Sequence, residues 1–398
     1  MERKAKKTDE RTKNGKALCA LIGAAVTGQN LSVSDDFDLD TALRVACSHN
    51  MLPIAYHALN RAGFTGKEMD RAAKDAGNMV FKQAKLKGME NKLSSAFSSK
   101  NIPYYILKGT QIQKYYPENM VRITTDSDFY VDEKNIEAVK TIMTDFGFEL
   151  LEYNAAEKSY EYTKQPRYNI EIHCLLDNTD KPDELEFLSS LLLNPIQDEG
   201  SMLRFNDEDM YLQVFFHLYK HFSQSGAGIK MFLDVFVLRR ELTLDTKRIK
   251  EKLESIGLDR FHSAVLRLCD VLFNGAKSDS ATDRFAEAVI SGGAFGVEGI
   301  NIGQNKIVSS DNPEAEKKAV VSKRLGTDKE NMKKRYPVLK KAPFLLPFCY
   351  GFKAVKCVVI HPKEALSICG YLRGLSSKNI KLKEKILTDV GLYEKLKK

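Results

Sequence analysis

The feature that most constrains the fold is a change of hydrophobic period near residue 101. Before it, residues 39–62 and 67–99 carry apolar side chains at helical spacing, and Pro53 marks a boundary between two helices. After it, short β-branched and aromatic runs alternate with polar turns, which is typical of strands. The predicted strands are 102–107, 128–131, 148–153, 159–163 and 169–174, with helices over 111–115 and 133–146.

Helical patterning returns after residue 207. The predicted helices are 210–222, 230–242, 246–256 and 259–273, followed by a Gly-rich loop at 291–312 and further helices. This order predicts an α+β fold, in which a small mixed β-sheet core is embedded in N- and C-terminal α-helical regions. The expected divisions are a helical region at 1–100, the sheet core at 101–205, a helical region packing on the core at 206–290, and the Gly-rich loop with C-terminal helices at 291–398.

The net charge of +8 is concentrated toward the chain ends. Residues 1–16 and residues 378–398 each carry a net charge of +4, so the segment between them has none. A neutral body with two basic tails is not the pattern of an RNA-binding face, which disfavours a long nucleic-acid partner. We expect both tails to be solvated and partly frayed.

Cysteine usage and hydropathy indicate a cytoplasmic protein without a transmembrane segment. The seven cysteines are an odd number without CxxC spacing, which favours free thiols in a reducing compartment. The longest apolar stretch, residues 343–360, is interrupted by Pro347, Gly351, Lys353 and Lys356. We expect a bent helix packed on the body, and contact with a membrane surface is the alternative.

Two acids near the second predicted strand carry the chemistry. Asp126 and Asp128 are two residues apart, so on a strand their side chains point the same way, while Ser127 and Phe129 point the other way. Two such carboxylates repel each other and resist burial, a conflict that a hard divalent cation removes. The pair therefore suggests a metal site for phosphoryl transfer, although a solvated turn is the simpler explanation of an isolated DxD.

The flanking segments strengthen the metal interpretation. Upstream, the first strand ends in Lys108-Gly109-Thr110, where a glycine lets the backbone approach a phosphate at a helix N-terminus. Downstream, Asn169, Glu171 and His173 share one face of an alternating strand. Glu171 can supply a third carboxylate, though an exposed Glu on a half-buried strand is also ordinary.

The ordered set of segments resembles the uncharacterised nucleotidyltransferase family of the polymerase-β-like superfamily. The order is a hydrophobic strand ending in Lys-Gly, an Arg followed by DxD at a strand, and a later strand with an acid, an aliphatic residue and His. The resemblance extends over nearly all of residues 40–360. Further pieces are Ala46 to Pro53, His217 to His221 followed by Asp234, Gly292 to Gly296, and Tyr336 to Pro347.

This resemblance implies a Mg²⁺- or Mn²⁺-dependent enzyme that transfers a nucleoside monophosphate from an NTP to the hydroxyl of an unidentified acceptor. Asp126, Asp128 and Glu171 would hold the metal, and Glu171 could also orient or deprotonate the acceptor. The Gly109-Thr110 turn would hold the β- and γ-phosphates. The cations Lys108, Arg122 and Lys220 would face the triphosphate, although Arg122 is as well suited to a structural pair with Asp126.

Four positions depart from the family pattern. Thr125 replaces a small residue or glycine, Ser127 replaces an aliphatic residue, Thr110 replaces Ser, and Glu171 replaces Asp. The departures at Thr125 and Ser127 motivate one alternative, a non-catalytic relative that binds nucleotide or a partner. A further alternative is a toxin of the nucleotidyltransferase type that modifies tRNA or protein. The acceptor, the preferred base, the pathway and the oligomeric state do not follow from the sequence.

Overall fold

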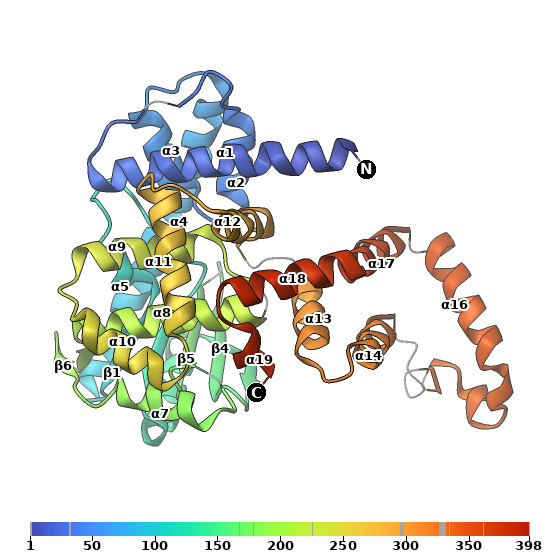
Figure 1. Cartoon of the computed structure of the whole chain (residues 1–398). Helices are drawn as coiled ribbons and strands as arrows, with labels where there is room; N and C mark the ends of the chain where they lie inside the picture. The colour runs from blue at the N-terminus through green and yellow to red at the C-terminus, as the bar shows by residue number, and fades with distance from the viewer. Residues whose placement is uncertain are drawn as a thin grey trace. The chain divides into compact units, whose positions relative to one another are not determined.

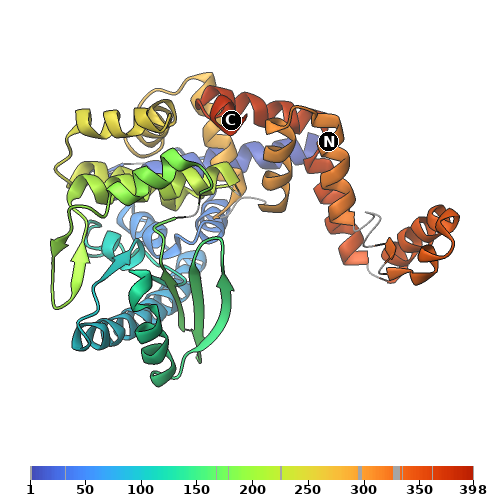
Figure 2. The same ribbon diagram turned by 90° about the horizontal axis from the view of Figure 1, so that it is seen from below.

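The computed structural model of the chain forms two compact units (Figures 1 and 2). The first comprises residues 1–220 and 227–294, and the second comprises residues 221–226 and 295–398. The structure describes residues 2–31, 33–166, 168–177, 179–224, 226–294, 298–325, 332–333, 335–360 and 362–397.

The first unit contains a mixed seven-stranded sheet in the order β3-β4-β5-β2-β1-β7-β6. Its strands are β1 (Tyr104–Leu107), β2 (Ser127–Val131), β3 (Glu149–Asn154), β4 (Ser159–Lys164), β5 (Tyr168–His173), β6 (Ile196–Gln197) and β7 (Met202–Arg204). The central pairs β2–β5 and β1–β7 are parallel, and the remaining neighbours are antiparallel. The predicted α+β class, with a mixed sheet flanked by helices, is therefore confirmed.

Helices α4 (Lys67–Ser99) and α6 (Ile136–Asp145) cover one face of this sheet. The central aromatic contact is Phe97 of α4 against Phe129 of β2, with ring centroids 5.4 Å apart. Neither ring is accessible to solvent. Because these rings fix the face of β2 that carries Phe129 and Val131 toward the core, Asp128 must leave the opposite face.

The strand pattern of the sequence matches this arrangement, with two omissions. All five predicted strands are present within two residues of their predicted limits. The pair β6–β7 was not predicted, and neither was α7 (Pro182–Ser190). The predicted helix at 133–146 is divided into a 3-10 turn, η1 (Glu133–Asn135), and α6, and Asp132 caps the turn by accepting from the Lys134 amide.

The other helices of the first unit have bounds close to those predicted, except α1 and α12, for which no helix bounds were predicted. They are α1 (Glu2–Thr27), α2 (Leu39–Ser48), α3 (Leu52–Arg61), α5 (Gly109–Gln113), α8 (Asp207–Gln224, ending in the second unit), α9 (Ile229–Glu241), α10 (Thr246–Ser255), α11 (Asp259–Phe273) and α12 (Ser280–Gly292). The expectation of a frayed basic N-terminus was wrong for the described residues. Residues 2–16 continue α1, and Lys16 pairs with Asp283 of α12 at 2.6 Å.

The second unit is helical. Its elements are α13 (Glu298–Ser309), α14 (Pro313–Leu325), η2 (Pro337–Lys340), η3 (Pro343–Leu345), α16 (Leu346–Ile360), α17 (Pro362–Gly374), α18 (Ser377–Asp389) and α19 (Tyr393–Lys397). Ile307, Tyr371 and Leu375 form its small core. The predicted Gly-rich loop at 291–312 is in fact helical over α13, although residues 295–297 lie outside the described part. No helix among the described residues has both the length and the apolar character needed to cross a bilayer.

Candidate active site

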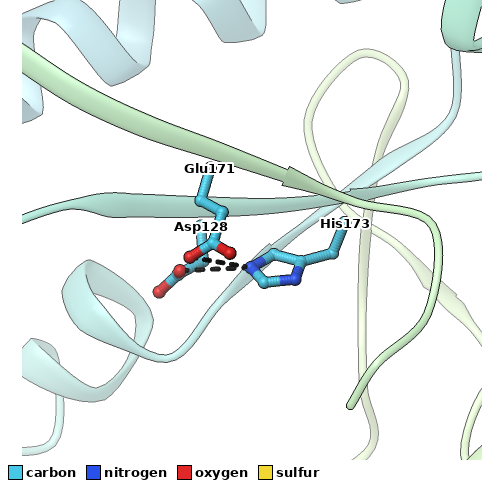
Figure 3. Close-up of side chains that lie close together, drawn as sticks. All are labelled: Asp128, Glu171 and His173. Carbon is cyan, nitrogen blue, oxygen red and sulfur yellow. Dashed lines mark hydrogen bonds and ion pairs between the residues drawn. The ribbon is translucent and has the colours of Figure 1, made fainter. Parts of the chain in front are cut away.

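The parallel pair β2–β5 brings two carboxylates side by side. Asp128 of β2 and Glu171 of β5 are direct register partners. On β5, Ile170 and Ile172 are fully buried against α4 and α6, so Glu171 and His173 leave the opposite face, as the alternating sequence predicted. Figure 3 shows the two carboxylates and the His173 ring pointing toward one another from the neighbouring strands.

Asp128, Glu171 and His173 have the geometry of a metal-binding group. His173 Nε2 lies 3.3 Å from Oδ1 of Asp128 and 3.5 Å from Oε2 of Glu171. One ligand atom from each residue lies within 4.8 Å of the other two. Two carboxylates suit Mg²⁺ or Mn²⁺, and an imidazole is tolerated better by transition metals than by Mg²⁺. The donor set therefore fits a divalent cation, with His173 either as a third ligand or as a hydrogen-bond partner of the carboxylates.

Interactions among these three side chains shift the pKa of each of them. Burial alone would lower the pKa of His173, but its bonds to Asp128 and Glu171 raise that pKa to about 9. Burial opposes ionisation of Asp128, yet Lys108 and His173 hold its pKa well below the usual range. The pKa of Glu171 is likewise lowered by His173 against the effect of burial. An imidazolium thus supplies the positive charge between the two carboxylates.

Asp126 lies in the turn before β2 rather than on the strand. Its Oδ1 accepts a hydrogen bond from the Thr124 hydroxyl at 3.0 Å. Burial, followed by the neighbouring Asp128 carboxylate, raises the pKa of Asp126. Among the described residues, Asp126 is not part of the compact group that could hold a metal, and His173 takes the third place.

Lys108 brings a cation to the same face from the end of β1. Its Nζ lies 3.9 Å from Oδ2 of Asp128. Burial would lower the pKa of Lys108, but Asp128 and then Asp177 outweigh it, and the pKa is raised. The backbone at Lys108 has φ 49° and ψ −133°, a conformation that costs a non-glycine residue about 1–3 kcal/mol. Strain of this kind persists where the surrounding structure fixes a side chain in place.

The Thr110 hydroxyl is directed away from the carboxylates. It donates to Oε1 and Oε2 of Glu90 on α4, at 2.8 and 2.9 Å. Ser127, on the core-facing side of β2, donates to the same Glu90 at 2.6 Å. Because Glu90 is fully buried, these bonds satisfy a carboxylate that would otherwise be costly in the core. Sequence reasoning missed Glu90, since a Glu in an amphipathic helix carries no signal of burial.

Arg122 is held by α9 rather than by Asp126. Its Nε and Nη2 donate to the two oxygens of Asp234 at 2.6 and 2.8 Å, and Nη1 donates to the Gly109 carbonyl at 3.3 Å. One turn earlier on α9, Lys230 Nζ donates to the Ile123 carbonyl at 3.1 Å. Two side chains of α9 therefore fix consecutive residues of the segment that leads into Asp126.

Lys220 belongs to a charged cluster next to Lys108. Both Lys220 and His217 of α8 contact Asp177, which follows β5, and the His217 Nδ1 to Asp177 Oδ2 distance is 3.4 Å. His217 Nδ1 also lies 3.4 Å from Lys108 Nζ. Burial would raise the pKa of Asp177, but His217 and Lys220 hold it well below the usual range. Asp177 was missed because it stands in a loop without a recognisable motif.

The structure thus gathers Lys108, Asp128, Glu171, His173 and Lys220 on one face of the sheet, with Asp126 beside them in the turn before β2. Two of the predicted residues make other contacts, Thr110 with Glu90 and Arg122 with Asp234. The cation-rich end of β1 lies next to two register-paired carboxylates. That combination can hold a divalent cation together with a polyphosphate.

Comparison with known proteins returns one family. Neither the curated proteins nor the solved structures gave a significant match. The model of a family described as uncharacterised nucleotidyltransferase matches residues 35–274, which contain the whole sheet and every site residue named above. This match covers more than half of the chain, and over residues 40–274 it agrees with the resemblance found in the sequence, whose further pieces at 292–296 and 336–347 lie outside the match. The chain therefore belongs to the uncharacterised nucleotidyltransferase family.

Proposed function

We propose that the protein is an enzyme that transfers a nucleoside monophosphate from an NTP to the hydroxyl of an acceptor, with Mg²⁺ or Mn²⁺ as cofactor. The observation that carries this proposal is the register pairing of Asp128 with Glu171 on adjacent parallel strands, in a chain of a nucleotidyltransferase family. A divalent cation bound there would neutralise charge on the phosphates.

Asp128 and Glu171 are the proposed metal ligands, with His173 beside them and Asp126 completing the site from the turn before β2. The raised pKa of Asp126 supports its role in the metal site. Burial and the neighbouring Asp128 carboxylate disfavour its ionised form, so a nearby cation would stabilise it.

Lys108 and Lys220 are the proposed contacts to the β- and γ-phosphates. The Lys108 side chain at the end of β1 is 14 % exposed, and the Gly109 backbone that follows has φ 36°. A side chain at Gly109 would meet Thr124 at 3.6 Å, so the glycine is required by its backbone conformation rather than by lack of space. This turn allows the chain to approach a phosphate closely.

In the proposed reaction, the acceptor oxygen forms a bond to the α-phosphorus and the bond between the α- and β-phosphates breaks. Pyrophosphate leaves with the bonding electron pair. The acceptor proton passes to a carboxylate, for which Glu171 is positioned on the open face of β5. Lys108 and Lys220 then stabilise the charge on the leaving pyrophosphate.

Calorimetric titration of ATP, GTP, CTP and UTP with Mg²⁺ tests the donor site. We expect saturable binding of at least one nucleotide by the wild type, and its loss in Asp128→Asn. Glu152→Gln is the matched control, since Glu152 is an exposed carboxylate on β3 of the same sheet. Well-folded wild type that binds no nucleotide would refute the proposal.

Turnover separates the proposal from its two alternatives. An active enzyme releases pyrophosphate when a suitable acceptor is present, and this release stops in Asp128→Asn. Nucleotide binding without pyrophosphate release across a broad acceptor set would favour a non-catalytic relative. Growth arrest on expression, abolished by Asp128→Asn with unchanged circular dichroism, would favour a toxin that modifies tRNA or protein.

A further inference from the structure

The second unit carries a line of exposed apolar side chains. Phe344 of η3 and Phe348, Phe352 and Val355 of α16 are 75, 75, 63 and 62 % exposed. Their spacing of four, four and three residues places them along one side of a helix, and we call these four residues the apolar stripe. Within the second unit these three phenylalanines are not packed against other residues as a buried helix face would be.

The stripe lies within the most one-sided charge distribution of the chain. Residues 331–363 contain eight Lys or Arg and no Asp or Glu. Lys333, Arg335, Lys340 and Lys341, which precede the stripe, are all exposed. An apolar side flanked by cations without compensating acids is the pattern of segments that lie in the interface of an anionic bilayer.

We propose that η3 and α16 bind the surface of a bilayer that contains anionic lipid. The apolar stripe would enter the boundary between headgroups and acyl chains, and the preceding cations would contact lipid phosphates. This proposal does not depend on the proposed catalytic activity, because none of its residues lies in the site built on β2 and β5.

Other occupants fit the same segment less well. A second copy of the chain would bring eight cations against eight cations, which opposes association through this segment. A single-stranded nucleic acid would stack on the three phenylalanines, but Val338 and Val355, which are 49 and 62 % exposed, add apolar surface without a stacking face. Aliphatic and aromatic side chains together suit acyl chains, which require only apolar surface.

Flotation of the full chain with vesicles tests the proposal. The vesicles consist of phosphatidylcholine alone, or of phosphatidylcholine with about one third phosphatidylglycerol. We expect binding to the anionic vesicles, weaker binding to the neutral ones, and weakening as salt rises toward about 1 M, where charges are screened within roughly 3 Å. The double variant Phe348→Ser/Phe352→Ser should weaken binding by roughly tenfold or more.

Phe81→Ser is the matched control. Phe81 on α4 is 61 % exposed and lies beside Lys85, whose Nζ is 4.5 Å from the ring centroid, but it is outside the stripe. We expect this variant to bind vesicles like the wild type. Since all the substituted rings are exposed, thermal melts should show that the three proteins fold equally well.

Four results would overturn the proposal. They are absence of binding to anionic vesicles by folded wild type, equal binding to both kinds of vesicle, an equal loss in Phe81→Ser, and unchanged binding in the double variant. If vesicles are not bound, loss of self-association in the double variant assigns the stripe to a second copy. Loss of polyuridylate binding in the same variant would assign it to nucleic acid.

Discussion

Asp128 and Glu171 are register partners across the parallel pair β2–β5, so their side chains leave the same face of adjacent strands. Strands in a sheet lie about 4.8 Å apart, which sets the spacing of the two carboxylates without any contribution from loops. His173, two residues beyond Glu171 on the same face, closes the group. The site is therefore built on paired strands of the sheet rather than on loops.

Metal binding should stabilise the protein against heat. A ligand that binds only the folded state at about one hundred times its Kd contributes roughly 2.7 kcal/mol. We expect Mg²⁺ or Mn²⁺ to raise the Tm of the wild type and of Glu152→Gln, and to leave Asp128→Asn and Glu171→Gln unchanged. Differential scanning calorimetry measures this, and an equal rise in all four proteins would argue against a cation between β2 and β5.

The positive charge of Lys108 should weaken the binding of metal alone and strengthen the binding of nucleotide. Its Nζ is 3.9 Å from Asp128, so it competes with a cation for that carboxylate while attracting phosphate. We expect Lys108→Met to bind Mn²⁺ alone roughly tenfold more tightly and to bind NTP with Mg²⁺ roughly tenfold more weakly. Lys92→Met, at an exposed position on α4, is the control. If both affinities move in the same direction, Lys108 has a structural role instead.

The Arg122–Asp234 pair should contribute to stability through its burial. Both side chains are less than one-tenth exposed, and Tyr116 also donates to Asp234 Oδ1 at 2.7 Å. Removing one partner leaves a buried unpaired charge, so Asp234→Asn or Arg122→Met should each cost about 3–5 kcal/mol in urea unfolding. The double variant Arg122→Met/Asp234→Asn should lose clearly less than the sum of the two single variants. Additive losses would show that the pair is not coupled.

Much of the sheet core followed from local pattern. The alternation of Asn169 to His173 predicted both the core-facing isoleucines and the open-face Glu171, because a strand exposes every second residue. The acid pair was recognised, but the strand begins at Ser127, so Asp126 falls in the preceding turn. Because the two-residue alternation holds only within the strand, it does not fix the direction of the Asp126 side chain, and His173 takes the third place in the compact group.

The remaining contacts depend on long-range packing. Strands β6 and β7 have only two and three residues, too few for a period to be read. Glu90 is buried because Thr110 and Ser127 meet it from other elements, and nothing in α4 alone indicates this. Asp177 likewise joins the site only through its contacts with His217 and Lys220, which lie 40 and 43 residues further along the chain.

His49 should make the protein sensitive to mild acid. The Ile229 amide donates to its Nδ1 at 3.1 Å, so the ring must carry its proton on Nε2, which donates to the Ile290 carbonyl at 3.1 Å. Burial lowers the pKa of His49 to about 4. Between pH 6.5 and 4, His49 is protonated in the unfolded chain but not in the folded protein. As the pH falls through this window, the free energy of unfolding should therefore decrease by about 1.4 kcal/mol per pH unit through this residue.

Urea unfolding at several pH values isolates this contribution. His49→Gln keeps a neutral donor and acceptor at the position and cannot titrate, so its stability should depend less on pH in that window. His57→Gln is the control, since the His57 ring is only half-buried and should account for little of the slope. A wild-type slope that persists in His49→Gln would assign the acid sensitivity to other groups, of which His262, also with a pKa of about 4, is the first to test.

Two helical glycines should respond oppositely to the same substitution. A Cβ on Gly23 of α1 would lie 1.9 Å from the Phe273 carbonyl oxygen at the end of α11, and backbone on both sides prevents a local adjustment. A Cβ on Gly77 of α4 would have no neighbour within 4 Å. Gly23→Ala should therefore cost about 2 kcal/mol or more, through overpacking. Gly77→Ala should stabilise by about 0.5–1 kcal/mol, because alanine favours the helix. Denaturant unfolding of both variants measures the difference, and a neutral Gly23→Ala would mean that α1 does not lie against α11 so closely.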